Sequence, residues 1–406
     1  MSGTPIERGF DPTDPTFIAD PYPAYRRLRD DDPVLWNPAT GQWLISRHTD
    51  VSRLLRDRRL GRTYLHQATH TEFGRTEPPP WHAPFHELND AGMLDREPPD
   101  HTRLRRLVLR AFTPPTVEAM RPRIEAIVDG LLDDLEGAGE FDLIADVAEP
   151  LPVTVIAELL GIPDADRPLL RPWSADICLM YELNPPDESA RRAVRASVEF
   201  GAYLRELLAE RRARPGGDLI SALAGVVDDG DRLTEQELIA TCVLLLNAGH
   251  EASVNGAGNG WWTLFRHPAD LARLRAEPAL LPTAVEELLR FDTPLPLFER
   301  WVLEPIEVRG VAIPRGSEVA LLFGSANRDP EAFERPDELD LRRDPNPSIA
   351  FGAGIHYCLG APLARLELGI LFGALLRRFP RLEPVAPPAW KPTFVLRGPK
   401  ALRVRA

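Results

Sequence analysis

The stretch from residue 351 to residue 360 contains the side chain best suited to chemistry, the thiol of Cys358. It reads FGAGIHYCLG and places that cysteine between glycines, directly before an apolar run with helical spacing. The glycines let the backbone turn tightly and approach a flat ligand closely. A sulfur at the start of a helix lies beside unpaired N–H groups and the positive end of the helix dipole, which favours the thiolate. The stretch therefore predicts a metal ligand.

A lone cysteine is more often a small buried hydrophobic side chain, so the spacing around it has to decide. A dinucleotide-binding loop is the other interpretation of these glycines, but no apolar strand precedes them in the required order. Instead, Phe351, Gly354, His356, Cys358 and Gly360 together match the signature of the haem-thiolate monooxygenases, and the chain resembles the cytochrome P450 family. The resemblance implies haem b (iron protoporphyrin IX), with the Cys358 thiolate as axial ligand. Further haem contacts are then expected at Phe351, Gly352, His356 and Gly360.

A long helical pattern runs from Thr234 to about Phe265. Thr234 and Glu237 form a capping box at its start, whereas glycines near its end lower its helix propensity. Its middle reads LLLNAGHEASVN, and the small residues Ala248 and Gly249 leave room on one face for a flat cofactor or a substrate. The resemblance implies that Ala248 contacts the haem and that the haem lies between this helix and the cysteine-loop helix.

Three consecutive residues of this helix are the candidates for catalysis. Glu251 matches the acid of the family's A-G-x-E/D-T motif, which helps to deliver protons during oxygen activation. The alcohol that usually follows is absent, because Ala252 occupies its position and Ser253 comes next. Ser253 is rotated by about 100° around a helix and does not simply replace the alcohol. Ordered water, Ser253 after a local distortion, or a hydroxyl of the substrate remain as alternatives.

Three basic residues are expected to bind the haem propionates. A helix is predicted after Pro99, and on it His101 and Arg105 share a face because they lie four residues apart. They form either a solvated basic face or, as the family's H-T-R-x-R motif implies, a grip on one propionate. We adopt the second interpretation, and the resemblance assigns Arg300 to the other propionate.

A glutamate and two arginines are expected to be structural. Glu287 and Arg290 have the three-residue spacing that brings two side chains together on a helix. An exposed pair of this kind contributes little to stability. In the family the pair is instead buried against an arginine before the cysteine, for which Arg343 is the matching position. Its role there is to hold the haem-binding loop.

The segment from Gly61 to Glu97 is rich in proline and loses all periodicity. A long irregular loop in a compact protein is usually functional or mobile, and in the family this region covers the substrate pocket. Aliphatic and aromatic residues of this loop, of the long helix and of later segments are expected to line that pocket: Met93, Leu94, Leu244, Leu245, Gly249, Leu295, Leu297, Phe298, Phe394 and Val395.

The length of 406 residues would suggest two domains, but the family folds such a length as one haem domain. We therefore expect a single domain over residues 1–406, mainly α with a smaller β-rich region, in the cytochrome P450 fold. The β-rich part is expected at about 34–60, 294–323 and 380–406, and the helical part at about 98–292 and 359–378.

Composition excludes several classes of protein. A net charge of −13 argues against nucleic-acid binding. The three cysteines form no C-x-x-C pair, which argues against a disulfide framework or a zinc ribbon and favours a reducing, cytoplasmic compartment. The polar N-terminal segment has no apolar run for a signal or membrane anchor. We expect a monomer without membrane attachment.

Together these features predict a monooxygenase of secondary metabolism that inserts one oxygen atom from O2 into a bulky, mostly apolar molecule, such as a natural product or a steroid. No flavin or nicotinamide domain is recognisable, so electrons should come from a separate ferredoxin and ferredoxin reductase, docking near Arg106, Arg110 and Arg365. Oxidative coupling, epoxidation or ring closure are alternatives within the same chemistry. A non-catalytic haem-binding sensor is the alternative from another class.

Overall fold

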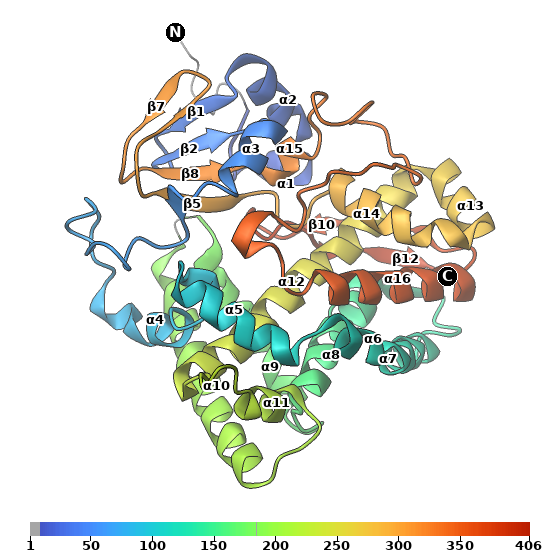
Figure 1. Ribbon diagram of the computed structural model, residues 1–406. Coiled ribbons are helices and arrows are strands. Elements are labelled where there is room, and N and C mark those ends of the chain that lie inside the picture. Colours follow the sequence, from blue (N-terminus) through green and yellow to red (C-terminus); the bar gives the residue numbers. More distant parts are fainter. Residues whose placement is uncertain (1–8, 184) are drawn as a thin grey trace. The chain divides into compact units, whose positions relative to one another are not determined.

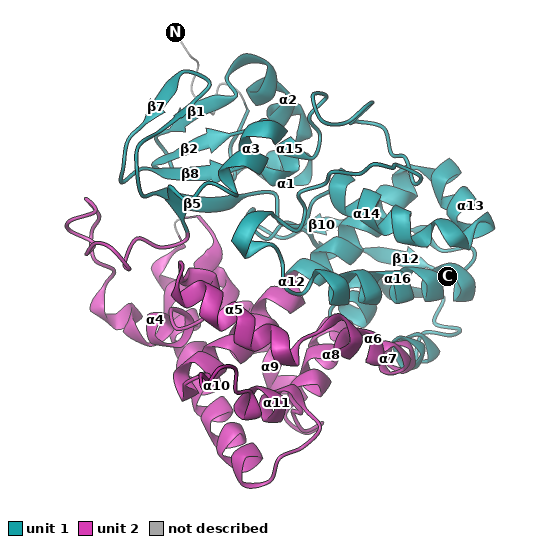
Figure 2. Ribbon diagram, in the orientation of Figure 1, with its two compact units in different colours: residues 1–61, 128–149, 252–406 teal, residues 62–127, 150–251 magenta. Residues whose placement is uncertain are grey.

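The computed structural model describes residues 9–183 and 185–406. The predicted domain range 1–406 therefore includes residues 1–8 and 184, which lie outside the described residues. The chain divides into two compact units, coloured separately in Figure 2. Unit 1 comprises Met1–Gly61, Val128–Glu149 and Ala252–Ala406, and unit 2 comprises Arg62–Ile127 and Pro150–Glu251.

The main sheet of unit 1 has five strands in the order β1-β2-β8-β5-β3 (Figure 1). Strands β1 and β2 form an antiparallel hairpin, whose turn contains Gly41 at a φ of 68°. Strand β8 is parallel to β2, and β5 is antiparallel to both β8 and β3. Apolar side chains such as Ile45, Val319 and Leu321 are fully buried in the core cluster of this sheet. The bounds are β1 Val34–Asn37, β2 Gln42–Ile45, β3 Leu60–Gly61, β5 Phe298–Val302 and β8 Glu318–Leu321.

Short strands complete unit 1. Strand β12 lies between β4 and β9, and two further pairs are β6 with β7 and β10 with β11. Strand β4 lies inside the range 98–292 that the sequence predicts to be helical. Its partner β12 is at the end of the chain, and local patterns do not reveal such a distant pairing. The bounds are β4 Glu140–Asp142, β6 Ile306–Val308, β7 Val311–Ile313, β9 Glu383–Pro384, β10 Ala389–Trp390, β11 Pro399–Ala401 and β12 Arg403–Arg405.

Helices α14 and α16 of unit 1 pack against each other. The Nη2 atom of Arg365 on α16 lies 3.0 Å from Oε2 of Glu286 on α14. The helical bounds in this unit are α1 Pro15–Ala19, α2 Tyr22–Asp31, α3 His48–Leu54, η3 Leu143–Ala148, α13 Pro268–Ala276, η5 Pro278–Leu280, α14 Leu281–Phe291, α15 Phe323–Ala326, η6 Gly354–His356 and α16 Ala361–Arg378. Helix α7, Arg121–Asp133, contributes its first part to unit 2 and its end to unit 1.

Unit 2 contains strongly helical segments and one region where the prediction was wrong. The segment 61–97 is not irregular throughout, because it contains η1, α4 and η2. Pro84 is compatible with α4 because it lies in the first turn, where its missing N–H has no helical partner. The bounds are η1 Pro80–His82, α4 Ala83–Asn89, η2 Met93–Asp95, α5 Asp100–Ala111, α6 Pro114–Ala119, α8 Pro150–Leu160, α9 Arg167–Cys178, η4 Leu179–Tyr181, α10 Asp187–Ala213 and α11 Leu219–Gly225.

The longest helix is α12, Glu235–Arg266, close to the predicted range. Its capping box is present, since the Glu237 carboxylate accepts from the N–H of Thr234 at 2.8 Å and the Thr234 hydroxyl accepts from the N–H of Glu237 at 3.2 Å. The helix continues through its glycines because they allow close packing. A Cβ at Gly258 would lie 2.8 Å from Cδ1 of Ile144, and one at Gly260 would lie 2.7 Å from Cζ of Phe372.

Among the described residues, none of the helices combines the length and the apolar character that crossing a bilayer requires.

Candidate functional site

The loop before α16 is built around Cys358. The N–H of Cys358 donates to the carbonyl of Phe351 at 3.0 Å, which closes the loop on itself. Gly352 and Gly354 have φ angles of 68° and 73°, in the left-handed region that favours glycine. A Cβ at Gly354 would also lie 2.3 Å from the carbonyl oxygen of Leu55. Glycine is therefore required at this position for both backbone and packing reasons.

The sulfur of Cys358 lies at the N-terminal end of α16. Gly360 is the N-cap of this helix, and a Cβ there would be 4.0 Å from the sulfur. Cys358 is half-buried. The first N–H groups of a helix lack intrahelical partners and carry its positive dipole end, so they stabilise a thiolate. The environment is that of a metal ligand.

Arg365 attaches the loop to its neighbouring helices. Its guanidinium lies over the ring of Phe351, 4.4 Å from the centroid. It also donates to the Tyr357 hydroxyl at 3.3 Å and forms an ion pair with Glu286. Hydrogen bonding to Glu286 raises the pKa of Arg365 above its ordinary value, so the guanidinium keeps its charge.

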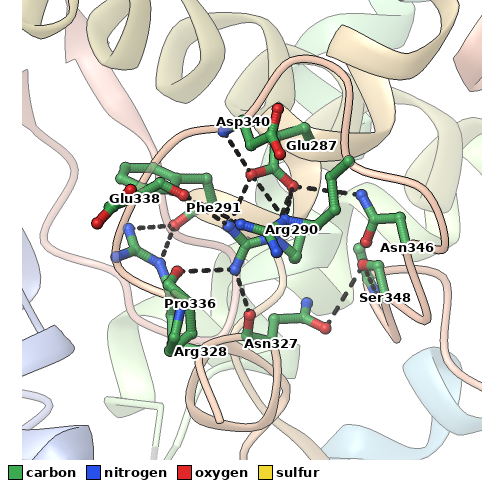
Figure 3. A network of polar contacts seen from close by, with 12 residues as sticks. Glu287, Arg290, Phe291, Asn327, Arg328, Pro336, Glu338, Asp340, Asn346 and Ser348 are labelled. Atoms are coloured by element: carbon green, nitrogen blue, oxygen red, sulfur yellow. Dashed lines mark hydrogen bonds and ion pairs between the residues drawn. The ribbon is translucent and has the colours of Figure 1, made fainter. Parts of the chain in front are cut away.

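Glu287 and Arg290 belong to the buried network shown in Figure 3, and Arg343 also contacts Glu287. Nε and Nη2 of Arg290 donate to the two carboxylate oxygens of Glu287 at 2.7 and 2.8 Å, and both side chains are 0% exposed. Nε of Arg343 lies 3.1 Å from each of the same oxygens. The three predicted structural residues thus lie together.

The network extends to the backbone that leads into the cysteine loop (Figure 3). The N–H of Asp340 donates to Glu287 at 2.9 Å, and the Asn346 amide donates to it at 3.3 Å. Nη1 of Arg290 donates to the carbonyl of Asn327 at 2.7 Å, and the Asn327 side chain accepts from the N–H of Ile349 at 2.9 Å. The ion pair therefore fixes the chain up to two residues before Phe351.

The middle of α12 contains a turn that other residues leave uncovered. Ala248 is exposed, and Leu244, Gly249, Glu251, Ala252 and Ser253 are half-buried, whereas residues 245–247 and 254–261 are buried. Leu244, Ala248, Glu251 and Ala252 follow the i, i+4, i+7, i+8 spacing of a single helix face. One face of α12, which carries a leucine, two alanines and a glutamate, is therefore accessible to solvent, whereas most of the neighbouring residues of the helix are buried.

These features fit one class of cofactor. Within the described residues, no group of three or more His, Cys, Asp and Glu could hold a bare metal ion. A single sulfur at a helix start, approached by a glycine loop, instead suits a metal whose other ligands belong to a flat organic ring. The site thus defines a haem-thiolate protein.

Comparisons with known proteins agree with this class. The sequence model of the family described as Cytochrome P450 matches residues 174–403. Cytochrome P450 107B1 of Saccharopolyspora erythraea is 43% identical, covering 97% of this chain and 96% of that protein. The cytochrome P450 monooxygenase PikC of Streptomyces venezuelae is 41% identical over 96% of this chain and 92% of its own length. The solved structure of the bacillaene polyketide synthase cytochrome P450 PksS from Bacillus subtilis has a TM-score of 0.89 at 37% identity, covering 98% of this chain and 99% of that one.

The chain therefore belongs to the cytochrome P450 family, and it is a cytochrome P450 monooxygenase of the bacterial type. The predicted fold class is confirmed. Its cofactor is haem b, with the thiolate of Cys358 as axial ligand.

The residues predicted to bind the propionates are basic and at least partly buried. His101 is buried and Arg105 half-buried on α5 in unit 2. Arg300 is buried on β5 in unit 1, where it donates to the carbonyl of Glu299 at 2.8 Å and lies 5.0 Å from the ring centroid of Phe298. Their haem contacts remain predictions.

The predicted pocket residues divide between the units. Those in unit 2 are Met93, Leu94, Leu244, Leu245 and Gly249, and those in unit 1 are Leu295, Leu297, Phe298, Phe394 and Val395. Half of them are buried: Met93, Leu245, Leu297, Phe394 and Val395. Their contact with substrate stays a prediction.

The arginines predicted to dock a redox partner are engaged in ion pairs. Arg106 and Arg110 on α5 both contact the carboxylate of Asp228, in the loop after α11. Arg365 contacts Glu286, as described above. These ion pairs were not predictable from local sequence patterns, because the partners lie far apart along the chain.

Several buried polar residues were not predicted from the sequence, and two of them lie on helices of the candidate site. Asn247 is buried on α12, and its position as a polar residue within LLLNAG could have signalled it. Glu367 is buried on α16, and burial raises the pKa of its carboxyl to about 8. Its position between Leu366 and Leu368, in an apolar helical segment, could have indicated this burial.

Proposed function

We propose that this protein inserts one oxygen atom from O2 into a C–H bond of a bulky, mostly apolar small molecule. Two electrons and two protons reduce the other oxygen atom to water. The observation that carries the proposal is the combination of the Cys358 loop with an acid, Glu251, on the uncovered turn of α12. The bound haem supplies the activation of O2, and its thiolate ligand favours O–O cleavage.

The residues of this chain have distinct tasks in that reaction. Cys358 binds the iron, while His101, Arg105 and Arg300 bind the propionates. Glu251 holds and passes a proton, because a carboxylate that is half-buried still exchanges protons with water. Ala252 contributes no hydroxyl, so a water or a substrate hydroxyl completes the path.

The substrate class follows from the character of the proposed pocket. Eight of its ten predicted residues are leucine, valine or phenylalanine: Leu94, Leu244, Leu245, Leu295, Leu297, Phe298, Phe394 and Val395. The other two are Met93 and Gly249. Apolar linings select bulky apolar ligands. PksS carries a name that refers to polyketide synthesis, and we propose a natural product of comparable bulk for this chain.

Electrons are proposed to come from a ferredoxin and its reductase, and the protein is proposed to act as a cytoplasmic monomer. None of the cysteines Cys178, Cys242 and Cys358, all of which the structure describes, forms a disulfide, which is typical of a reducing compartment. Among the arginines proposed to dock the ferredoxin, Arg365 lies on α16, the helix that directly follows the cysteine loop. Its reversal to glutamate should slow reduction of the iron.

The test is reconstitution of the holoenzyme with a surrogate ferredoxin and ferredoxin reductase. A compound library is first screened for displacement of water from the iron, seen as a shift of the Soret band. Compounds that bind should then accelerate NADPH consumption and yield a product carrying one atom of 18O from 18O2. Ligands that shift the spectrum but never yield NADPH-dependent product would instead support a haem-binding sensor.

A further inference from the structure

The guanidinium of Arg365 contacts both ends of the cysteine loop. Arg365 lies on α16, seven residues after Cys358. It lies over the ring of Phe351, 4.4 Å from the ring centroid, and its Nη1 donates to the Tyr357 hydroxyl at 3.3 Å. Phe351 is the residue whose carbonyl accepts from the N–H of Cys358, and Tyr357 directly precedes Cys358. One side chain therefore contacts two residues that adjoin the cysteine from different sides.

The positive charge of Arg365 is offset by one acid. Nη2 of Arg365 lies 3.0 Å from Oε2 of Glu286 on α14, and its Nε donates to the other oxygen of the same carboxylate. The pair is only partly exposed, with 37% of the Arg365 side chain and 31% of the Glu286 side chain accessible. Solvent screens a partly buried pair less than a pair on the open surface. The electrostatic field at the loop therefore depends on both charges.

A charge beside a thiolate ligand changes how readily the iron accepts an electron. Reduction adds one negative charge to the iron, its sulfur ligand and the porphyrin taken together. A neighbouring cation therefore stabilises the reduced form, and a neighbouring anion destabilises it. The groups that surround a metal ligand tune its redox potential in this way. Arg365 and Glu286 should thus act in opposite directions on the potential, although they belong to the same ion pair.

We propose that Arg365 is a positioning residue of the Cys358 loop whose charge, offset by Glu286, sets the reduction potential of the haem iron. The guanidinium holds Phe351 and Tyr357 through one planar group, and the carboxylate holds the guanidinium by a two-point contact. The inference rests on the haem-thiolate class of the protein and not on the proposed reaction. It gives Arg365 a role at the iron that requires no docked ferredoxin.

The test is the equilibrium reduction of the substrate-free holoenzyme against the redox dye safranin T, without ferredoxin and without turnover. Arg365→Gln should shift the equilibrium constant toward the oxidised form by about threefold or more, and Glu286→Gln should shift it by a similar factor toward the reduced form. Arg365→Lys keeps the charge and should stay within about twofold of the wild type. Arg377→Gln is the matched control, because Arg377 is exposed in the last turn of the same helix, about 18 Å farther along its axis.

Opposite shifts in Arg365→Gln and Glu286→Gln, with no shift in Arg377→Gln, would support the proposal. Shifts of the same sign would mean that the pair only holds the loop, and they would overturn it. An unchanged potential in Arg365→Gln, or an equal shift in the control, would overturn it as well.

The carbon monoxide complex of each variant shows whether the sulfur is still bound to the iron. If Arg365→Gln loads too little haem or loses the red-shifted band, two variants of Glu286 decide. Glu286→Gln removes the charge and keeps the size, whereas Glu286→Asp keeps the charge and shortens the side chain. A shift toward the reduced form in Glu286→Gln alone would support the proposal. Equal shifts in both variants, or none in Glu286→Gln, would overturn it.

Discussion

Ala252 is the residue at which this chain departs from the A-G-x-E/D-T motif of its family, at the turn of α12 that we propose to be catalytic. Glu251, Ala252 and Ser253 are all half-buried on α12. Ser253 is rotated by about 100° from Ala252 around the helix axis. The protein therefore keeps the acid but lacks an alcohol at the expected place. Under the proposed function, the missing hydrogen bond comes from water, from Ser253 after a local distortion, or from a hydroxyl of the substrate.

Replacing Ala252 with threonine tests which of these applies. If a substrate hydroxyl completes the proton path, Ala252→Thr should raise the amount of product per NADPH severalfold for ligands without a hydroxyl and should not raise it for the natural substrate. The measurement compares product, peroxide and NADPH for both kinds of ligand. An increase for every substrate would mean that the natural site is merely less efficient.

Glu251 provides the second test at this scale. Glu251→Gln removes the transferable proton with little change in size, so turnover should fall by about 10²-fold, the low end of the effect of acid–base groups. The solvent isotope effect on turnover should increase as well. Ser253→Ala is the matched neighbour and should change turnover less than twofold. Comparable losses in both variants would mean that Ser253 takes part in proton delivery.

At the scale of elements, the Glu287–Arg290 ion pair on α14 positions the cysteine loop. It does so by hydrogen bonds to the backbone of the segments that lead into that loop. Glu287 accepts from Arg290 and Arg343 and from backbone and side-chain groups of the segment 340–346. Glu287 and Arg290 are fully buried and therefore removed from bulk water. Loss of one partner leaves the others with unpaired charge.

Glu287→Gln should therefore lower the free energy of unfolding by about 3–5 kcal/mol, the usual cost of breaking a buried pair. Haem loading should fall in parallel. The control is Glu338→Gln, because Glu338 and Arg335 have the same three-residue spacing but are 63% and 62% exposed. Its loss should be at most about 1 kcal/mol. Urea unfolding measures both, and equal losses would contradict a structural role for burial of the pair.

Helix α16 contains a carboxyl whose titration affects stability. Burial raises the pKa of Glu367 from its ordinary value of 4.5 to about 8. Between these values the folded state binds the proton more tightly than the unfolded state does. The free energy of unfolding contributed by this group therefore decreases as pH rises from 4.5 to about 8, and is constant above.

Glu367→Gln should remove this dependence, so the variant should gain stability relative to the wild type as pH rises through that window. Urea unfolding at several pH values between about 5 and about 8 gives the difference. Glu334→Gln is the control, since the Glu334 side chain is 89% exposed. The same pH dependence in the Glu367 variant and the wild type would contradict a buried, protonated carboxyl.

At the scale of the whole molecule, the sequence predicted what local patterns encode. The capping box and the helical period placed α12 within a residue at each end, and the family signature placed Cys358 before α16. Pairings between distant segments were not predictable, such as β4 with β12 or Arg106 with Asp228. The burial of the Asn247 side chain likewise appears only in three dimensions, since it depends on which other elements pack against α12.

The two compact units share α12, and the division between them falls between Glu251 and Ala252. Unit 1 contains the cysteine loop and the network that holds it, whereas unit 2 contains Glu251, Asn247 and the helices before them. The cysteine that binds the haem iron and the acid proposed to deliver protons are thus carried by different parts of the chain.

The most direct measurement is the absorption spectrum of the reduced holoprotein with carbon monoxide. The wild type should show the red-shifted Soret band of thiolate-ligated haem, and Cys358→Ser should lose both this band and turnover. Cys178→Ser and Cys242→Ser, which alter the two other cysteines, should keep the band. Absence of the band in the wild type, or full turnover in Cys358→Ser, would contradict the account.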